Sequence, residues 1–401
     1  MDVSGFLLEL LIILVAARAA AEVFAYLRLP AVVGEVMAGV LIGPSLLNVV
    51  RVEPVFSLLA GIGILLLLFE VGMDTDAAQL AKTGGESSLV ALTGVVAPAA
   101  LAFWASRYWL ALPFLTSLFI AGALVATSIG ITVRVLGDLK MERTRFARVV
   151  LGAAVLDDVI GVVILAMLID YSRVRAVEWL PGLRGLVFIL VFLVAAPVIT
   201  KLIVPPIAAA AGRSRSKGSL ATAAIALILA LALAAEMVGA PALIGAFAAG
   251  IALSRKSCFS FGPYTCGLGN GLSERIETGT KPIIDLFVPI FFVMVGVSID
   301  FRAIDFSQGQ FWLMAAILTP LAMIGKAISG VWARGGFKTK ALTGISMIPR
   351  GEVGLVFAQA GKTSGIFNDA IYAVVVFTVA LTTLAAPLLL KAIARKDRQG
   401  V

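Results

Sequence analysis

The chain has 401 residues, of which 60% are hydrophobic and only 14% charged, with a formal net charge of +8 and no histidine. Soluble domains contain about 45–50% apolar and about 25% charged residues, so this composition excludes an ordinary soluble protein. The basic residues lie mostly in loops between apolar stretches, which the positive-inside rule explains, and this placement argues against nucleic-acid binding.

The apolar stretches predict an all-α polytopic membrane protein, because a helix needs about 20 residues to cross the hydrocarbon core. The first stretch lacks a basic n-region and a cleavage site, so we expect a retained helix and not a signal peptide. About thirteen transmembrane helices are expected, near residues 4–28, 30–48, 54–74, 84–106, 112–136, 146–170, 183–211, 218–238, 240–255, 279–299, 309–333, 340–361 and 367–393.

Alternate loops differ in their content of lysine and arginine. Lys140, Arg143 and Arg145 belong to the richer set, whereas Arg107 and Arg302 belong to the poorer one. The richer side should be cytoplasmic. The sequence therefore predicts a multi-pass protein of the cell (inner or plasma) membrane with its N-terminus outside and its C-terminus in the cytoplasm.

The chain also repeats itself. PAVVG at 30–34 matches PALIG at 241–245, and the Val-Gly pair at 71–72 matches the pair at 295–296. The second copy begins seven predicted helices after the first, so the two copies should cross the membrane in opposite senses, as in secondary transporters. We expect inverted repeats at 1–181 and 216–401 with a linker helix at 182–215. Small residues that serve helix packing alone are the alternative explanation.

Residues 149–169 read VVLGAAVLDDVIGVVILAMLI, in which Asp157 and Asp158 are the only charges. A carboxylate at mid-bilayer depth costs a few kcal/mol, so the pair indicates a place where cations or protons bind. Lys326 is the only charge from 311 to 332. We expect one aspartate to pair with Lys326 while the other faces the ion pathway. The alternative is that Lys326 extends towards the membrane surface.

Two predicted helices contain breaking signals, ATSIG at 126–130 and MIPRGE at 347–352. Transporter sites lie where helices break near the midplane. Thr127 and Ser128 offer oxygen ligands for a small cation, although hydroxyls also bond to the preceding helical turn. Arg350 and Glu352 would either neutralise half-helix ends or form a mutual ion pair that holds the fold, which is the interpretation we favour.

Together, ATSIGITVRVLGDL at 126–139, LDDVIG at 156–161, the isolated Lys326 and IPRGEVGLV at 348–356 resemble the NapA-type sodium/proton antiporters of the monovalent cation:proton antiporter-2 family. The resemblance implies an NhaA-like fold with unwound crossing helices, and a homodimer. It also implies that Asp158 is the main cation-binding carboxylate, that Asp157 is the partner of Lys326, and that Thr127 and Ser128 belong to the crossing. An aspartate pair is associated in that family with electrogenic exchange.

The sequence thus predicts a non-enzymatic carrier that exchanges sodium or lithium for protons by alternating access, with the lipid bilayer as its surroundings and no cofactor. A potassium/proton antiporter of the Kef type is the nearest alternative, although such proteins usually carry a C-terminal nucleotide-binding domain. A cation channel or sensor is a further alternative. Cys258 and Cys266 show no metal-ligand spacing, and no role is assigned to them.

Overall fold

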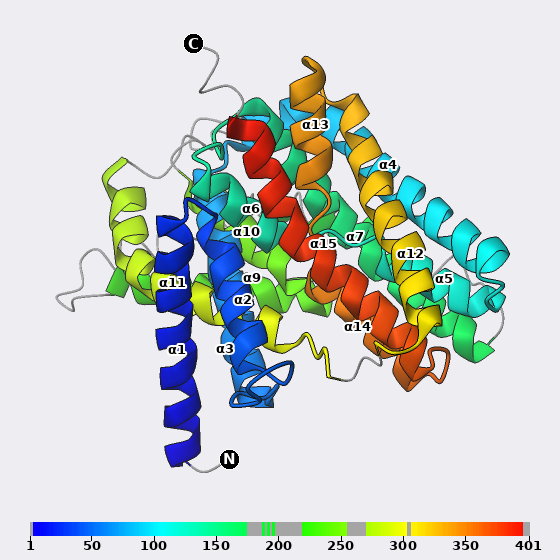
Figure 1. Ribbon diagram of the computed structural model, residues 1–401. Helices are drawn as coiled ribbons and strands as arrows, with labels where there is room; N and C mark the ends of the chain where they lie inside the picture. Colours follow the sequence, from blue (N-terminus) through cyan, green and yellow to red (C-terminus); the bar gives the residue numbers. More distant parts are fainter. Residues whose placement is uncertain are drawn as a thin grey trace. The chain divides into compact units, whose positions relative to one another are not determined.

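The structure is a computed structural model that describes residues 3–174, 219–254, 270–302 and 306–395, with short pieces between 187 and 196. Every regular element in these residues is helical (Figure 1). The α-helices are α1 (Val3–Tyr26), α2 (Ala31–Ile42), α3 (Pro54–Asp74), α4 (Ala77–Trp104), α5 (Phe114–Ala123), α6 (Ile129–Asp138), α7 (Arg145–Val174), α9 (Ser219–Met237), α10 (Ala242–Leu253), α11 (Asn270–Val297), α12 (Gly309–Ile328), α13 (Phe337–Ser346), α14 (Glu352–Thr363) and α15 (Asp369–Arg395). A π-helical turn, η1 (Ala105–Trp109), extends α4, and a 3-10 turn, η2 (Ser329–Trp332), extends α12.

The predicted all-helical membrane architecture is confirmed. Eight helices in the described part of the chain are long and apolar enough to cross a membrane, and α2, α5 and α10 are shorter apolar helices. The predicted spans 112–136 and 340–361 are each two helices, α5 with α6 and α13 with α14. The predicted helix at 183–211 lies almost entirely outside the described residues, so the total of thirteen spans stays a prediction.

The chain forms two compact units, neither of which is continuous in sequence. The first unit comprises 1–56, 84–179 and 292–401, and the second comprises 57–83 and 180–291. This division follows contacts and not the order of the chain, because a helix packs on whichever apolar face is complementary to its own. The predicted repeat boundaries at 181 and 216 therefore stay a prediction.

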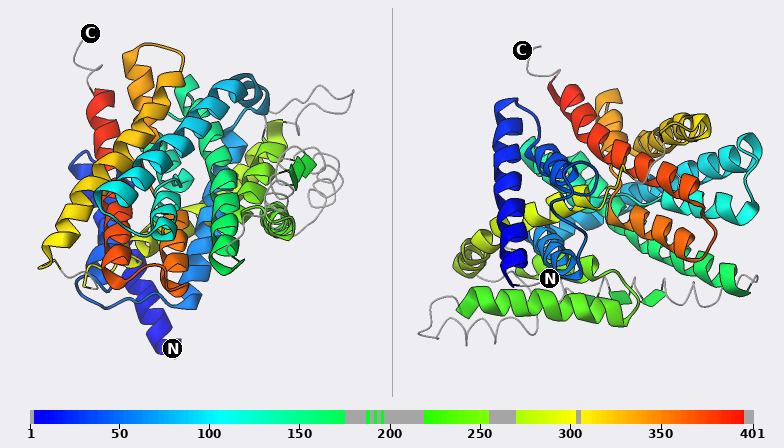
Figure 2. Two further views of the ribbon diagram at one scale, coloured as in Figure 1. Left: turned by 90° about the vertical axis from the view of Figure 1, so that its right-hand side faces the viewer. Right: turned by 60° about the horizontal axis from the view of Figure 1, so that its bottom comes forward.

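The core of the first unit lies among α5, α12, α14 and α15. Phe119, Phe311 and Phe357 are fully or almost fully buried in it, together with the small and β-branched residues of α15. In this unit α12 packs on α15, and α14 packs on both α5 and α15 (Figure 2). Buried aromatic rings of this kind contribute much of the packing energy of a core. Helices α5 and α14, which border the two breaks described below, are therefore well packed.

Close glycine contacts join helices of the two sequence repeats. In the first unit, a Cβ on Gly39 of α2 would overlap the Val293 carbonyl oxygen and lie 2.9 Å from the Cα of Gly296 on α11. In the second unit, a Cβ on Gly250 of α10 would lie 2.8 Å from the Cα of Gly72 on α3. The repeat aligns these glycines in pairs, because Gly39 and Gly250 each lie nine residues after the proline of PAVVG or PALIG, and Gly72 matches Gly296. Each repeat thus contributes the equivalent glycine to an equivalent crossing, as small-residue packing in membranes permits.

A hydrogen-bonded serine lies near the first of these crossings. The hydroxyl of Ser45, just after α2, donates to the carbonyl of Ile299 beyond α11 and accepts the amide N–H of Phe301. The two segments are therefore tied by polar contacts as well as by packing.

We expect Gly39→Ala to destabilise the protein by about 1–3 kcal/mol, because backbone atoms of α11 fill the space that the methyl group needs. The matched control is Gly61→Ala in α3, where an added Cβ meets nothing within 4 Å. Alanine is a better helix former than glycine, so the control should be neutral or slightly stabilising. Thermal unfolding in detergent measures both variants, and equal unfolding temperatures would contradict the close contact.

Candidate functional site: two crossing breaks around a buried ion pair

Two helices of the first unit are interrupted. The chain is not helical at 124–128, between α5 and α6, or at 347–351, between α13 and α14. Pro349 accounts for the second break, because proline has no amide N–H and disfavours a helical residue before it. Both breaks fall on the predicted stretches. Unwound backbone at membrane depth is tolerated only where it is buried in protein or lines a cavity, and here it is buried.

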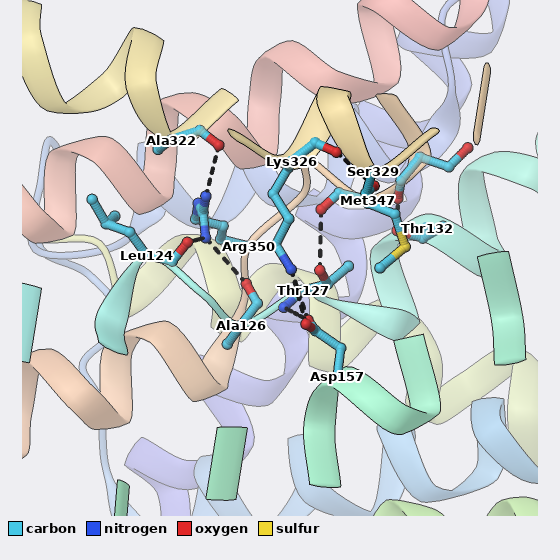
Figure 3. Close-up of polar contacts among 11 residues, drawn as sticks. Leu124, Ala126, Thr127, Thr132, Asp157, Ala322, Lys326, Ser329, Met347 and Arg350 are labelled. Carbon is cyan, nitrogen blue, oxygen red and sulfur yellow. Dashed lines mark hydrogen bonds and ion pairs between the residues drawn. The ribbon is translucent and has the colours of Figure 1, made fainter. Parts of the chain in front are cut away.

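The two unwound segments bond to each other. The amide N–H of Ser128 donates to the carbonyl of Pro349 at 2.8 Å, and the hydroxyl of Thr127 donates to the carbonyl of Met347 at 3.1 Å. One turn into α6, the hydroxyl of Thr132 donates to the carbonyl of Ser346 at 2.9 Å. The breaks free these carbonyls from helical bonding, and the opposite segment satisfies them (Figure 3). Thr127 therefore does not bond to the preceding turn.

Arg350 neutralises the end of a half-helix of the other repeat. Its guanidinium is fully buried and donates to the carbonyl of Leu124, and at 3.5 Å to that of Ala126, where α5 ends. It also donates to the carbonyl of Ala322 in α12 at 3.0 Å (Figure 3). The C-terminal end of a helix carries partial negative charge, which a cation stabilises. The side chain of Glu352 lies outside the described residues, so the mutual ion pair stays a prediction.

Lys326 and Asp157 form a buried ion pair. The ammonium of Lys326 lies 2.9 and 3.0 Å from the two carboxylate oxygens of Asp157, and both side chains are 0% exposed. Asp157 also accepts the amide N–H of Thr127 at 2.8 Å, so it ties α7 to the first break as well as to α12 (Figure 3). The expected pairing of one aspartate with Lys326 is present, and the alternative that Lys326 reaches the membrane surface is wrong.

Asp158 is also buried, with 2% of its surface exposed. Adjacent helical residues point about 100° apart, and both described hydrogen bonds from the Lys326 ammonium to a carboxylate go to Asp157. Ser128 is 2% exposed, and its hydroxyl bonds to no described residue. The crossing therefore brings together six of the predicted site residues: Asp157, Asp158, Thr127, Ser128, Lys326 and Arg350. Their part in ion binding stays a prediction.

Helix α15 also bonds to the second break, which the sequence did not predict. The hydroxyl of Thr383 in α15 donates to the carbonyl of Arg350. Asp157 of α7 plays the equivalent part in the first repeat, since it accepts the backbone N–H of Thr127 in the first break. The order of the repeat, in which α7 and α15 each follow a broken helix, is the signal that points to Thr383.

Comparison with known proteins identifies the family. Residues 10–396 match the sodium/hydrogen exchanger transmembrane family. The chain belongs to this family. It is 29% identical to the high-affinity Na⁺/H⁺ antiporter NhaS3 of Synechocystis, over 97% of this chain and 90% of that protein. It is 32% identical to the Na⁺/H⁺-K⁺ antiporter GerN of Bacillus cereus, over 96% of this chain and 95% of that protein.

The fold of this family member is also found among solved structures. The sodium proton antiporter MjNhaP1 of Methanocaldococcus jannaschii superimposes with a TM-score of 0.71 at 15% identity, over 99% of this chain and 98% of that one. A second structure of the same antiporter, at pH 8, gives a TM-score of 0.66 at 14% identity. At such identities the similarity establishes the fold.

Proposed function

We propose that the chain exchanges sodium or lithium for protons across the cell membrane by alternating access. The observation that carries this proposal is the buried ion pair beside a second buried carboxyl. Asp157 and Asp158 supply two carboxylates, and Lys326 supplies one ammonium. Arg350 donates to the backbone carbonyls of Leu124 and Ala322, so its positive charge is balanced by helix carbonyls and is not counted with these three groups. When both aspartates are ionised and Lys326 is protonated, the three side chains together carry one net negative charge. A cation or a proton can neutralise it.

Competition for that charge is sufficient for exchange. Sodium prefers hard oxygen ligands, which the carboxylate of Asp158, the hydroxyls of Thr127 and Ser128 and the backbone of the break can supply. A site that holds either a sodium ion or a proton is neutralised and can pass the membrane midplane. An empty, charged site is held back by the cost of desolvation. Sodium that leaves on one side is thereby replaced by a proton.

The relatives support sodium over the alternatives. NhaS3 and the Enterococcus hirae relative carry the name Na⁺/H⁺ antiporter, and the match covers at least 90% of each protein. The Kef-type alternative and the channel are therefore not favoured. GerN is named for potassium as well as sodium, so we include potassium as a second cation in the test below. We further propose a homodimer in the plasma membrane with the N-terminus outside.

Proteoliposomes that contain a pH dye provide the test. A gradient of sodium or lithium is expected to drive proton movement at rates well above those of protein-free liposomes, with a weaker response to potassium and none to choline. The membrane potential should change the rate, because an aspartate pair is associated with electrogenic exchange. Such exchange requires a second proton beyond the one that replaces sodium, and we propose that Lys326 carries it. Cation flux that needs no opposing proton would instead identify a channel.

A further inference from the structure

Three charged side chains join α2 to α6 outside the crossing. Glu35 of α2 is only 2% exposed, and its Oε1 lies 3.8 Å from an Nη of Arg134 on α6. Arg134 in turn lies 3.9 Å from a carboxylate oxygen of Asp138, one turn further along α6. A buried carboxyl in a membrane protein is a functional candidate by default, and the exchange mechanism above does not use this one.

Asp138 makes a second contact with α2. Its other carboxylate oxygen accepts the amide N–H of Ala31, the first residue of α2, at 2.9 Å. The residue before α2 is Pro30, which provides no side-chain cap. The first amide groups of a helix need acceptors, and the partial positive charge there favours an anion. Asp138 therefore caps α2 from another helix.

The position of α6 links this cluster to the ion site. At its N-terminal end α6 follows Ser128, which bonds to the second break. At its C-terminal end it carries Asp138, and the following loop contains Lys140 and Arg143, which predict the cytoplasmic side. A movement of the crossing would be transmitted along this ten-residue helix to the contact with α2.

We infer that Glu35, Arg134 and Asp138 form a latch that holds the cytoplasmic end of α6 against α2 and opens in every transport cycle. The inference rests on the proposed exchange function, in which the crossing moves relative to other helices. The two ion pairs are longer than hydrogen bonds, and Glu35 Oε2 and Arg134 Nε make no hydrogen bond with a described residue. One ordinary hydrogen bond, from the Ala31 amide, and two long ion pairs can hold one conformation and still separate, as a two-state element requires.

A reversible cross-link between α2 and α6 tests the latch. Cysteines replace Ala31 and Gly137, which leaves the three charged residues in place, in a background with Cys258→Ser and Cys266→Ser. We expect a short bis-methanethiosulfonate to lower sodium-driven proton movement in proteoliposomes at least tenfold, and a thiol reductant to restore it. The control places cysteines at Gly85 and Thr144, beside the Glu86–Arg145 ion pair of 2.7 Å, where cross-linking should change exchange less than twofold.

The charged residues themselves are tested by a double-mutant cycle. Glu35→Gln and Arg134→Gln should each lower the half-saturating cytoplasmic sodium concentration about fivefold, since an open latch favours the state that faces the cytoplasm. The double variant should show no further change. Wild-type protein without exchange would refute the proposed function. Exchange by the Ala31→Cys/Gly137→Cys variant that persists after cross-linking would overturn the latch alone. An equal loss of exchange from both cross-links, or additive effects of Glu35→Gln and Arg134→Gln, would overturn it as well.

Discussion

Asp158→Asn is expected to reduce sodium–proton exchange to the background rate. Asparagine nearly matches aspartate in shape but has no charge to attract sodium and no proton to exchange at working pH. The side chain is buried, with 2% exposed, so no solvent anion takes its place. In everted membrane vesicles with a pH dye, addition of sodium to the variant should produce no dequenching.

The matched control for this variant is Asp369→Asn. Asp369 has the same chemistry at the start of α15, but its side chain is 88% exposed and forms an ion pair with Lys362, which is 43% exposed. Exchange by the control should equal that of the unmodified protein. Full activity of Asp158→Asn, at an equal level of protein in the membrane, would show that Asp158 is not the cation-binding carboxylate.

Lys326→Ala is expected to have the second largest effect. It leaves the carboxylate of Asp157 buried without its ammonium, and breaking a fully buried pair from one side costs about 3–5 kcal/mol. The unfolding temperature should fall clearly, and Asp157→Asn in the same protein should restore much of it. Any exchange that remains should lose its dependence on membrane potential, since the second proton that Lys326 is proposed to carry is then absent.

Lys362→Ala is the matched control for the lysine. Its pair with Asp369 is 3.0 Å long but largely exposed, with 43% and 88% of the side chains accessible. Exposed pairs contribute at most about 1 kcal/mol, so both stability and voltage response should stay near those of the unmodified protein. An unchanged voltage response in Lys326→Ala would mean that Lys326 does not set the charge of the moving unit.

The sequence was sufficient for the features that local chemistry determines. The second break was predictable because Pro349 has no amide N–H to donate. The buried acid was predictable because Asp157 lies in the middle of an apolar stretch long enough to span a membrane. The ion pair with Lys326 was predictable for a related reason, because an isolated charge in each of two apolar helices needs a partner. The membrane fold follows from length and hydrophobicity alone.

Contacts that depend on how distant helices approach each other were not predictable. Arg350 bonds to the Leu124 carbonyl, 226 residues away, and no pattern around Arg350 distinguishes that partner from the nearby Glu352. Thr132 and Thr383 look like ordinary helical hydroxyls until the crossing brings carbonyls within reach. Glu35 lies within a predicted span, but Arg134 is 99 positions later in the sequence, and no pattern in either stretch predicts that the two residues pair.

The glycine crossing of α2 with α11 has a consequence for biosynthesis. Ser45 and its acceptor Ile299 are 254 residues apart, so α2 enters the bilayer long before the ribosome has made the helix on which it packs. Until then Gly39 lacks the α11 backbone that lies against it in the folded protein. Helix α2 can pack on α1 as soon as both are made, but it must remain in the membrane without its α11 partner until most of the chain has been synthesised.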